Sequence, residues 1–308
     1  MGLMRTALLK ASQSEWLAQQ VRGRRFAQRA SRRFMPGEDV EAALAAAEQL
    51  RDRRIPTLVT LLGEAITQRL EAEQVAREYL ELLDRIERRG LPMQLSVKLT
   101  QLGLDVNRDV CVELLTRVAA RAKAVRNHVC IDMEASSYVD ATLEVFRAVH
   151  SVHSNVGVCL QAYLFRTADD LEALLPLQAP IRLVKGAYRE PPHVAFPSKR
   201  DVDENFFKLA QRLLCEDRPG TVPHGFGTHD ARLITRIQDF AAGRGLPNDA
   251  YEIQMLYGIR REDQYRLAAR GYAVRTLISY GRHWFPWYMR RLAERPANLL
   301  FVAKSLFR

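Results

Sequence analysis

The sequence has no run of 18 apolar residues, so it predicts no membrane-spanning helix. Residues 1–16 also lack the continuous apolar core of a signal peptide, and we therefore expect a cytoplasmic protein. Only four cysteines occur in 308 residues, and none has CxxC spacing, which argues against a disulfide framework and a cysteine zinc site. We expect reduced, buried thiols at all four positions, which are Cys111, Cys130, Cys159 and Cys215.

Histidine also gives little support for a metal site. The segment HSVH (150–153) can place two imidazoles on one helical face, but no carboxylate or third histidine stands beside them. The end of a surface helix is the favoured interpretation, and we predict no bound metal.

A glycine-rich GxGxxG turn is missing after the first predicted strand, which argues against an open, doubly wound nucleotide-binding sheet. From Pro56 onward, short apolar segments alternate with helical stretches eight times. The candidate strands are residues 57–64, 92–99, 128–134, 156–163, 181–188, 221–229, 251–256 and 273–279. Such strands, buried on both faces and separated by helices, predict an α/β fold of the (β/α)8 barrel type.

The helices between these strands show apolar residues at three- and four-residue steps. Residues 72–90 end at Gly90, and residues 203–216 open at Asp203, a candidate N-cap. Residues 1–54 precede the barrel and are helical in pattern, most clearly over 41–54, so we expect them to pack outside it. Without a low-complexity linker, the chain is interpreted as one domain, 1–308, with the barrel over 55–308.

The net charge of 46 − 36 = +10 is distributed unevenly. Residues 5–33 contain eight Lys or Arg and one acidic residue, Glu15, a pattern that suits an anionic membrane surface or nucleic acid. Only two aromatic residues, Trp16 and Phe26, lie in this stretch, which argues against nucleic acid. A solvated helical face remains the alternative to a membrane contact.

Polar residues gather at the carboxyl ends of the predicted strands, where barrel enzymes place their chemistry. The set comprises Glu64, Lys98, Asp132, Glu134, Gln161, Tyr163, Lys185, Tyr188, Thr228, His229 and Asp230, with Arg182 near the start of its strand. Individually, Lys98 could simply pair with Asp132, and His229 could cap the next helix. Together they predict a catalytic mouth, because unpaired buried charge is costly without a ligand.

Several of these segments resemble motifs of the proline dehydrogenases, including the matching domain of the bifunctional proline utilization A flavoproteins. The motifs are LLGE (61–64), SVKLTQLG (96–103), IDMEA (131–135), LQAY (160–163), RLVKGAY (182–188), GTHD (227–230), YEIQMLYG (251–258) and RRLAERPANLLFV (290–302). The resemblance implies a distorted barrel that holds FAD non-covalently and oxidises L-proline to Δ1-pyrroline-5-carboxylate. It also implies electron transfer to a membrane quinone and, because no aldehyde dehydrogenase domain follows, the single-activity form.

Carried over by motif, the resemblance implies a role for each matching residue. Lys98, Arg290 and Arg291 bind the proline carboxylate, and Asp132 orients this basic cluster. Arg182 lies beside the reactive edge of the flavin, and Glu64 pairs with Arg291 as a gate when substrate is absent. The remaining FAD contacts are Met133, Gln161, Val184, Lys185, Gly186, Ala187, Thr228 and His229. Gly186 is expected to permit close backbone approach to the cofactor.

The chain departs from the family at two positions. Relatives commonly have tyrosine where this sequence has Leu277 and Trp287, so we expect a roomier, more apolar pocket beside the proline ring. Two rival functions remain open on the sequence. Lys98 or Lys185 could form a Schiff base in a barrel aldolase, and the basic N-terminal stretch could make the protein a nucleic-acid binder.

Overall fold

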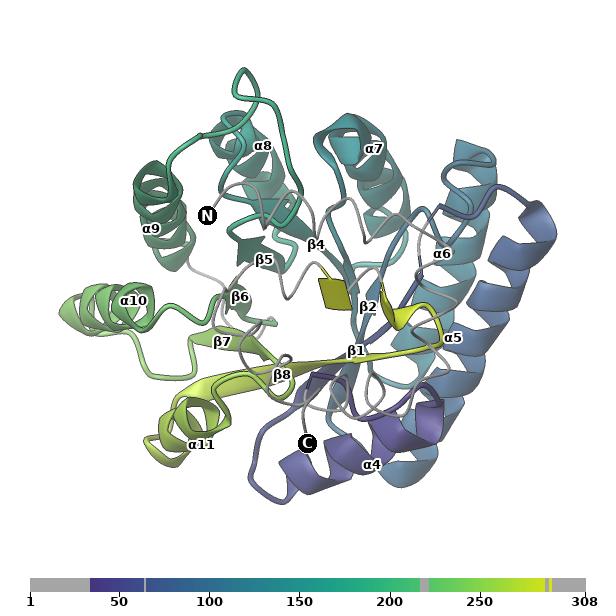
Figure 1. Cartoon of the computed structure of the whole chain (residues 1–308), viewed down its shortest axis with the longest axis horizontal. Helices are drawn as coiled ribbons and strands as arrows, with labels where there is room; N and C mark the ends of the chain where they lie inside the picture. Colours follow the sequence, from purple (N-terminus) through teal and green to yellow (C-terminus); the bar gives the residue numbers. More distant parts are fainter. Residues whose placement is uncertain (1–33, 64, 217–221, 286–287, 290–308) are drawn as a thin grey trace, which may run out of the picture.

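In the part of the chain that the computed structural model describes, eight parallel strands form a closed barrel in sequence order (Figure 1). The described residues are 34–63, 65–216, 222–285 and 288–289. The strands are β1 Thr57–Leu61, β2 Met93–Val97, β3 Val129–Ile131, β4 Val156–Gln161, β5 Ile181–Val184, β6 His224–Gly227, β7 Tyr251–Leu256 and β8 Ala273–Tyr280. Each predicted strand is therefore present, and pairing of β1 with β8 closes the sheet. The predicted barrel is confirmed.

Several strands are shorter than predicted at their carboxyl ends. Residues 128–134 were expected to form one strand, but β3 ends at Ile131, after which the backbone turns into the barrel mouth. Asp132 still donates its N–H to the carbonyl of Val97 (2.8 Å), and Gln161 holds the next two carbonyls. The Gln161 side chain thus binds the carbonyls of Met133 and Glu134 in place of a neighbouring strand, and the ladder stops after Asp132.

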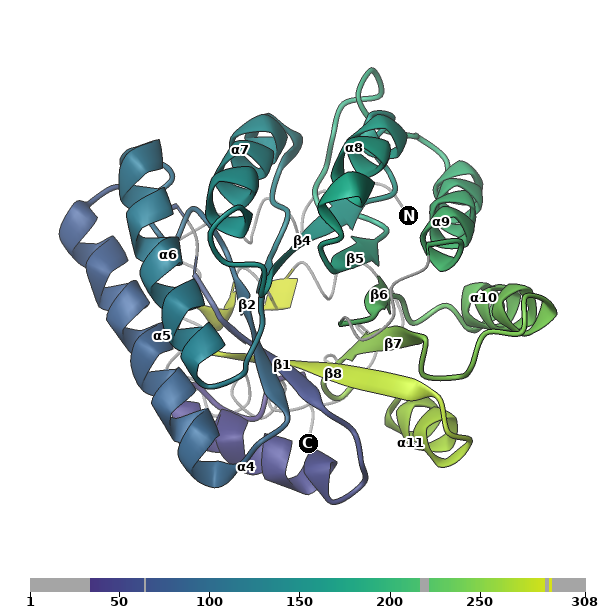
Figure 2. The ribbon, with the colours of Figure 1, turned by 180° about the vertical axis from the view of Figure 1, so that it is seen from behind.

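Helices surround the barrel on its outer side (Figures 1 and 2). They are α4 Val40–Arg51, α5 Arg69–Arg89, α6 Arg108–Ala124, α7 Val139–His150, α8 Thr167–Leu174, α9 Lys199–Leu214, α10 Ala231–Gly243 and α11 Arg261–Ala269. Gly90 ends α5 with φ of 57°, as its left-handed C-cap position requires. The expected N-cap at Asp203 is wrong. Helix α9 begins earlier, where the Ser198 hydroxyl accepts from the N–H of Asp201, and Asp203 lies within the helix.

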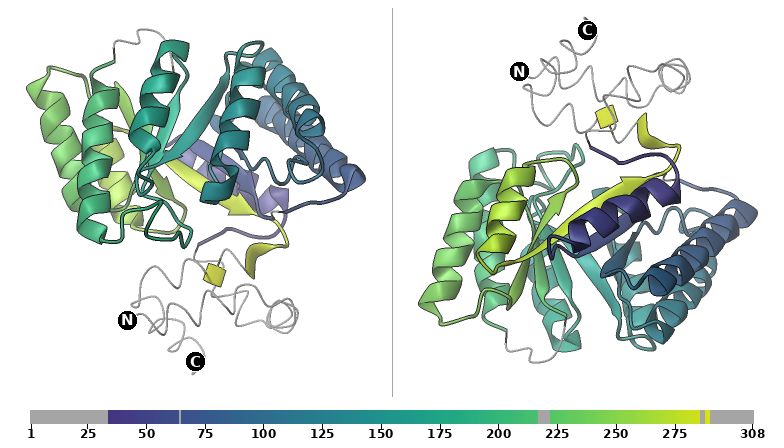
Figure 3. Two further views of the ribbon diagram at one scale, coloured as in Figure 1. Left: turned by 90° about the horizontal axis from the view of Figure 1, so that it is seen from above. Right: turned by 90° about the horizontal axis from the view of Figure 1, so that it is seen from below.

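The N-terminal helical pattern over 41–54 corresponds to α4, which is capped by the Asp39 carboxylate. This helix packs against β8 and β1 on the outside of the barrel (Figure 3). The basic stretch 5–33 lies outside the described residues. Among those described, no helix combines the length and apolar character needed to cross a bilayer.

The structure also tests the expectations for cysteines and for a metal site. All four cysteines are unpaired. Cys111 and Cys159 are buried as expected, but Cys130 is only partly buried and Cys215 is exposed near the end of α9, so the expected burial is wrong at Cys215. Within the described ranges, no group of three or more His, Cys, Asp or Glu residues could hold a metal ion.

Arginine–carboxylate pairs join neighbouring helices around the outside. They include Arg85–Glu41 between α5 and α4 (2.6 Å), Arg121–Asp84 between α6 and α5 (2.8 Å), Arg212–Glu172 between α9 and α8 (2.7 Å) and Arg236–Glu204 between α10 and α9 (2.8 Å). Their side chains are about one-third to more than one-half exposed, so each pair contributes little to stability. The ring of helices depends mainly on the apolar faces buried against the strands.

One ion pair lies inside the barrel instead. Arg275 of β8 binds Glu252 of β7 through two hydrogen bonds, Nη2 to Oε1 at 2.6 Å and Nε to Oε2 at 2.8 Å. A third bond runs from Arg275 Nη1 to the carbonyl of Thr57 on β1 (3.1 Å). Both side chains are under 10% exposed, so each charge would be buried without compensation if the other were removed.

We predict that Arg275→Met lowers the free energy of unfolding by about 3–5 kcal/mol, because it leaves the Glu252 carboxylate buried without its cation. The double variant Arg275→Met/Glu252→Leu should recover most of that loss. Arg212→Met is the surface control and should cost no more than about 1 kcal/mol. Urea unfolding measures all three. Equal losses for Arg275→Met and Arg212→Met would show that the interior pair carries no special weight.

Candidate active site

A cavity of about 1560 Å³ opens at the carboxyl ends of the barrel strands. Its wall includes Thr60 from β1, Gln161 from β4, Gln254 from β7 and both Leu277 and Ser279 from β8. Small-molecule pockets generally measure some 300–1,000 Å³, so this cavity can take more than one small ligand. It lies where the sequence predicts a catalytic mouth.

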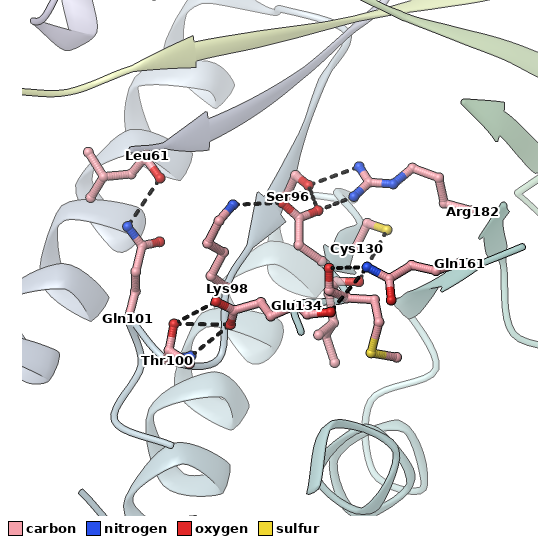
Figure 4. Close-up of polar contacts among 12 residues, drawn as sticks. Leu61, Ser96, Lys98, Thr100, Gln101, Cys130, Glu134, Gln161 and Arg182 are labelled. Carbon is pink, nitrogen blue, oxygen red and sulfur yellow. Dashed lines mark hydrogen bonds and ion pairs between the residues drawn. The ribbon is translucent and has the colours of Figure 1, made fainter. Parts of the chain in front are cut away.

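At its base, the carboxylate of Asp132 joins two cations, Lys98 and Arg182, which are labelled in Figure 4. Lys98 Nζ lies 3.2 Å from Oδ2, and Arg182 Nη2 donates to Oδ1. Ser96 Oγ donates to the same Oδ1 at 2.5 Å and accepts from Arg182 Nη1 at 3.0 Å. Three strands, β2, β3 and β5, therefore meet through one carboxylate.

The electrostatics of this cluster leave one positive charge in excess. Burial alone would raise the pKa of Asp132, but the charges of Arg182 and Lys98 and the Ser96 hydrogen bond outweigh it and lower the pKa to about 2. Burial opposes the charge of Arg182, yet the Asp132 carboxylate raises the pKa of the guanidinium well above its usual value. Two cations thus share one ionised carboxylate, and the cluster can attract a further anion.

A second set of hydrogen bonds fixes the loops that carry these groups. Glu134, at the end of the unwound β3 segment, accepts from Thr100 Oγ1 at 2.8 and 3.0 Å and from Thr100 N at 3.2 Å. Thr100 stands two residues after Lys98, so this bond anchors the turn from which Lys98 projects (Figure 4). Gln161 Nε2 binds the carbonyls of Met133 and Glu134 at 3.2 and 3.1 Å.

The outer part of the cavity is mostly basic. Lys185 Nζ lies 2.5 Å from Asp203 Oδ1 and 3.2 Å from Asp230 Oδ2. Lys199 shares both carboxylates. Burial would raise the pKa of Asp230, but the hydrogen bonds and charges of Lys185 and Lys199 lower it to about 2. Arg200, Arg232 and Arg236 line the same region, where Glu204 is the one further carboxylate among the described residues, so an anionic ligand is favoured there.

The structure shows a further physical reason for glycine at position 186, beside the expected approach to a cofactor. The φ of Gly186 is 113°, and a Cβ there would lie 2.3 Å from Cδ1 of Tyr163. The ring of Tyr163 therefore occupies the space of the missing side chain. The Tyr163 hydroxyl in turn donates to Glu190 Oε1 at 3.3 Å, and Ser136 N donates to the same carboxylate at 2.8 Å. These bonds hold the segment after β5 against the cavity.

After β6, the helix-cap interpretation of His229 is wrong. Asp230 caps α10 by accepting from the N–H of Arg232 at 3.1 Å. His229 Nε2 accepts from the N–H of Leu256 at 2.9 Å, an arrangement that requires the proton on Nδ1. His229 therefore orients the end of β7.

The cavity brings together most of the site residues expected from the sequence. On its wall are Lys98, Asp132, Met133, Gln161, Arg182, Val184, Lys185, Gly186, Ala187, Thr228 and His229. Glu64, Arg290, Arg291 and Trp287 lie outside the described residues. Sequence reasoning missed Ser96 and Thr100. Their only signal was a hydroxyl within or just after an apolar strand, on either side of Lys98.

Comparison with known proteins agrees with this geometry. A family model described as proline dehydrogenase matches residues 43–304. The chain is 37% identical over 278 residues to proline dehydrogenase 1 of Bacillus subtilis, covering 90% of this chain and 91% of that protein. It is 36% identical over 311 residues to the proline dehydrogenase of Deinococcus radiodurans, covering 99% and 98%.

A solved structure shows the same likeness. Proline utilization A from Bdellovibrio bacteriovorus, inactivated by N-propargylglycine, superposes with a TM-score of 0.79 at 25% identity. The match covers 87% of this chain and 33% of that one, so the chain spans about a third of the larger protein. Because the family model and the two relatives each match most of its length, the chain belongs to the proline dehydrogenase family, enzymes that oxidise proline.

Proposed function

We propose that the protein holds FAD non-covalently in the 1560 Å³ cavity, oxidises L-proline to Δ1-pyrroline-5-carboxylate and passes the electrons to a membrane quinone. The observation that carries the proposal is the buried cluster in which Lys98 and Arg182 share Asp132. Its excess positive charge suits an amino acid carboxylate, and it lies on the wall of a cavity that also has room for a large cofactor.

The polar groups of the cavity wall fit such a cofactor. Thr60 Oγ1, Gln161 Oε1 and Ser279 Oγ are buried and have no hydrogen-bond partner within the described part of the chain. These neutral atoms can bind the polar edge of a flavin ring, whose N–H and carbonyl groups need partners. The basic outer region, with Lys185 and Arg232, suits a pyrophosphate. Bound FAD would supply the chemistry that side chains lack, by accepting a hydride from proline C5.

The side chains position proline for that step. Lys98 Nζ has three donors, so its bond to Asp132 leaves others for the proline carboxylate. We propose that Arg290 and Arg291 complete this site and that Glu64 gates it through Arg291. A carboxylate held by Lys98 and two planar guanidiniums can bind in only a few orientations, and that limits how the ring meets the flavin.

The same charges favour the reactive form of the amine. Proline in water is an ammonium, and hydride can leave C5 only when the nitrogen lone pair is available. A neighbouring cation disfavours a charged ammonium. The excess positive charge of Lys98 and Arg182 therefore favours release of the amine proton before oxidation.

The Schiff-base alternative receives less support. A lysine that attacks a carbonyl must be neutral and unpaired. Lys98 is ion-paired with Asp132, and Lys185 with both Asp203 and Asp230. These lysines are arranged as cations.

For its place in the cell, we propose a cytoplasmic protein, one domain over 1–308, that contacts the inner membrane face reversibly. The eight Lys or Arg residues within 5–33 are the candidate contact. Such a contact would bring the protein to its quinone.

The proposed function is tested by the absorbance spectrum of the purified protein. We expect a flavin spectrum whose chromophore is released intact on denaturation and identified as FAD. Anaerobic L-proline should bleach the flavin band. Protein without flavin, combined with borohydride trapping of substrate on a lysine, would support the aldolase alternative instead.

We predict that Asp132→Asn lowers kcat/KM for proline about ten- to a hundred-fold, because one charge-assisted partner of Lys98 and Arg182 is lost. Asp84→Asn, which weakens the surface pair with Arg121, is the matched control and should keep wild-type kinetics. Flavin content and circular dichroism confirm folding in both. Normal kcat/KM in folded Asp132→Asn would refute the role of the cluster.

A further prediction concerns Leu277, which lines the cavity from β8 beside Leu58 of β1 and Leu256 of β7. An apolar wall discriminates poorly against one added hydroxyl, by about a hundred-fold. We expect weak but measurable turnover of 4-hydroxyproline, and its kcat/KM relative to proline should fall in Leu277→Tyr. An unchanged ratio would mean that residue 277 does not contact the ring.

A further inference from the structure

Beneath the active-site cavity lies a second, much smaller chamber in the barrel. Its volume is about 30 Å³, and its wall includes Gln94, His128, Cys130 and Glu252. Arg182 and Gln254 line both this chamber and the large cavity above it. Their side chains therefore form the partition between the two spaces.

Gln254 is held in this partition from two sides. Its Nε2 donates to Glu252 Oε2 at 3.0 Å, and Glu252 is the buried partner of Arg275. On the other side it packs over Gly225 of β6, where a Cβ would lie 2.3 Å from Gln254 Nε2. The Gln254 amide thus fills the space that a side chain at position 225 would need. Because its Nε2 is held in this way, the direction of Oε1 is fixed as well.

Two polar atoms of the partition have no partner in the described part of the chain. They are Gln254 Oε1, an acceptor, and Arg182 Nε, a donor. The other two nitrogens of Arg182 are bound, Nη1 to Ser96 and Nη2 to Asp132. Buried polar atoms of this kind are normally satisfied by protein or by ordered water.

The chamber has the size and chemistry for such a water. A single water needs at least roughly 10–15 Å³ of this kind of volume and two to four polar partners. Water can accept from Arg182 Nε and donate to Gln254 Oε1, and His128 Nδ1 is a third polar atom without a partner on the same wall. The Cys159 thiol also interacts with the Arg182 guanidinium, but sulfur is a weak acceptor and leaves this role to water. Burial raises the pKa of the Cys130 thiol to about 12, and burial together with Arg275 lowers the pKa of His128.

We propose that an ordered water in this chamber bridges Arg182 Nε and Gln254 Oε1, and that Gln254 is a positioning residue for Arg182. The Arg182 guanidinium then has a hydrogen bond at each of its three nitrogens, and these bonds oppose rotation about Cδ–Nε. The chain of contacts runs from Arg275 through Glu252, Gln254 and the water to Arg182. The interior ion pair thereby orients the charge that faces the catalytic cavity.

The direct test is a crystal structure that shows ordered water. We expect density in wild type at about 2.7–3.2 Å from both Arg182 Nε and Gln254 Oε1. In Gln254→Met, which keeps the length of the side chain but removes both polar atoms, that density should be lost. A chamber without this water in wild type, or a water that contacts only one of the two atoms, would overturn the proposal.

The solution test rests on the proposed flavin chemistry. In Gln254→Met we expect the rate of flavin reduction by proline, per bound flavin, to fall about ten-fold. If the reoriented Arg182 weakens binding of the reduced flavin by the same ten-fold, the two-electron midpoint potential becomes about 30 mV more negative. A merely structural role for Gln254 would leave the potential unchanged.

Asn155→Leu is the matched control. Asn155 is a buried amide whose Nδ2 binds the carbonyls of Ala119 and Asn127 at 3.0 and 3.1 Å, and its side chain lines neither space. It should lower the melting temperature and leave rate and potential unchanged. Wild-type rate and potential in Gln254→Met would refute the positioning role. Absence of flavin from wild type would instead refute the proposed function, and the crystallographic test of the water would still decide the inference.

Discussion

The site depends on the burial of one carboxylate, Asp132, between two cations. Removing the Asp132 carboxylate would leave both cations uncompensated in a medium that solvates charge poorly. This demand explains the groups that converge on Asp132, which stands directly after β3 and meets Lys98 after β2 and Arg182 on β5. It also explains the two hydroxyls nearby. Ser96 binds carboxylate and guanidinium together, and Thr100 fixes the turn after Lys98.

The same constraint extends below the site. Barrels of this kind usually fill their interior with branched apolar side chains. Here Arg182 on β5 and the Arg275–Glu252 pair between β8 and β7 are all buried, so charge continues well below the mouth. Gly225 leaves room for Gln254 between these layers. The inside of the barrel therefore contains connected polar contacts, whereas the helices bury apolar faces against the outside of the strands.

The barrel could be predicted from the sequence because each strand is a short apolar segment. The length of these segments and their regular alternation with helices are enough to recognise the fold. The cavity wall followed from residue chemistry at the strand ends together with motif resemblance. Ser96 and Gln254 could not be found in this way, because their roles depend on which strands become neighbours. Asp203 resembles an N-cap in the sequence because acidic residues are common at helix starts. The structure places it inside α9, where it pairs with Lys185, and that tertiary contact is not visible in the sequence.

The charge of the cluster relates the fold to the reaction. Free proline carries an anionic carboxylate and a cationic amine. For oxidation, the carboxylate must stay ionised so that it can be bound, and the amine must lose its proton. A site with one excess positive charge favours both, since it attracts the carboxylate and disfavours the ammonium. A neutral cluster would do neither. Because its neighbours lower the pKa of Asp132 to about 2, this carboxylate stays ionised across the whole physiological pH range.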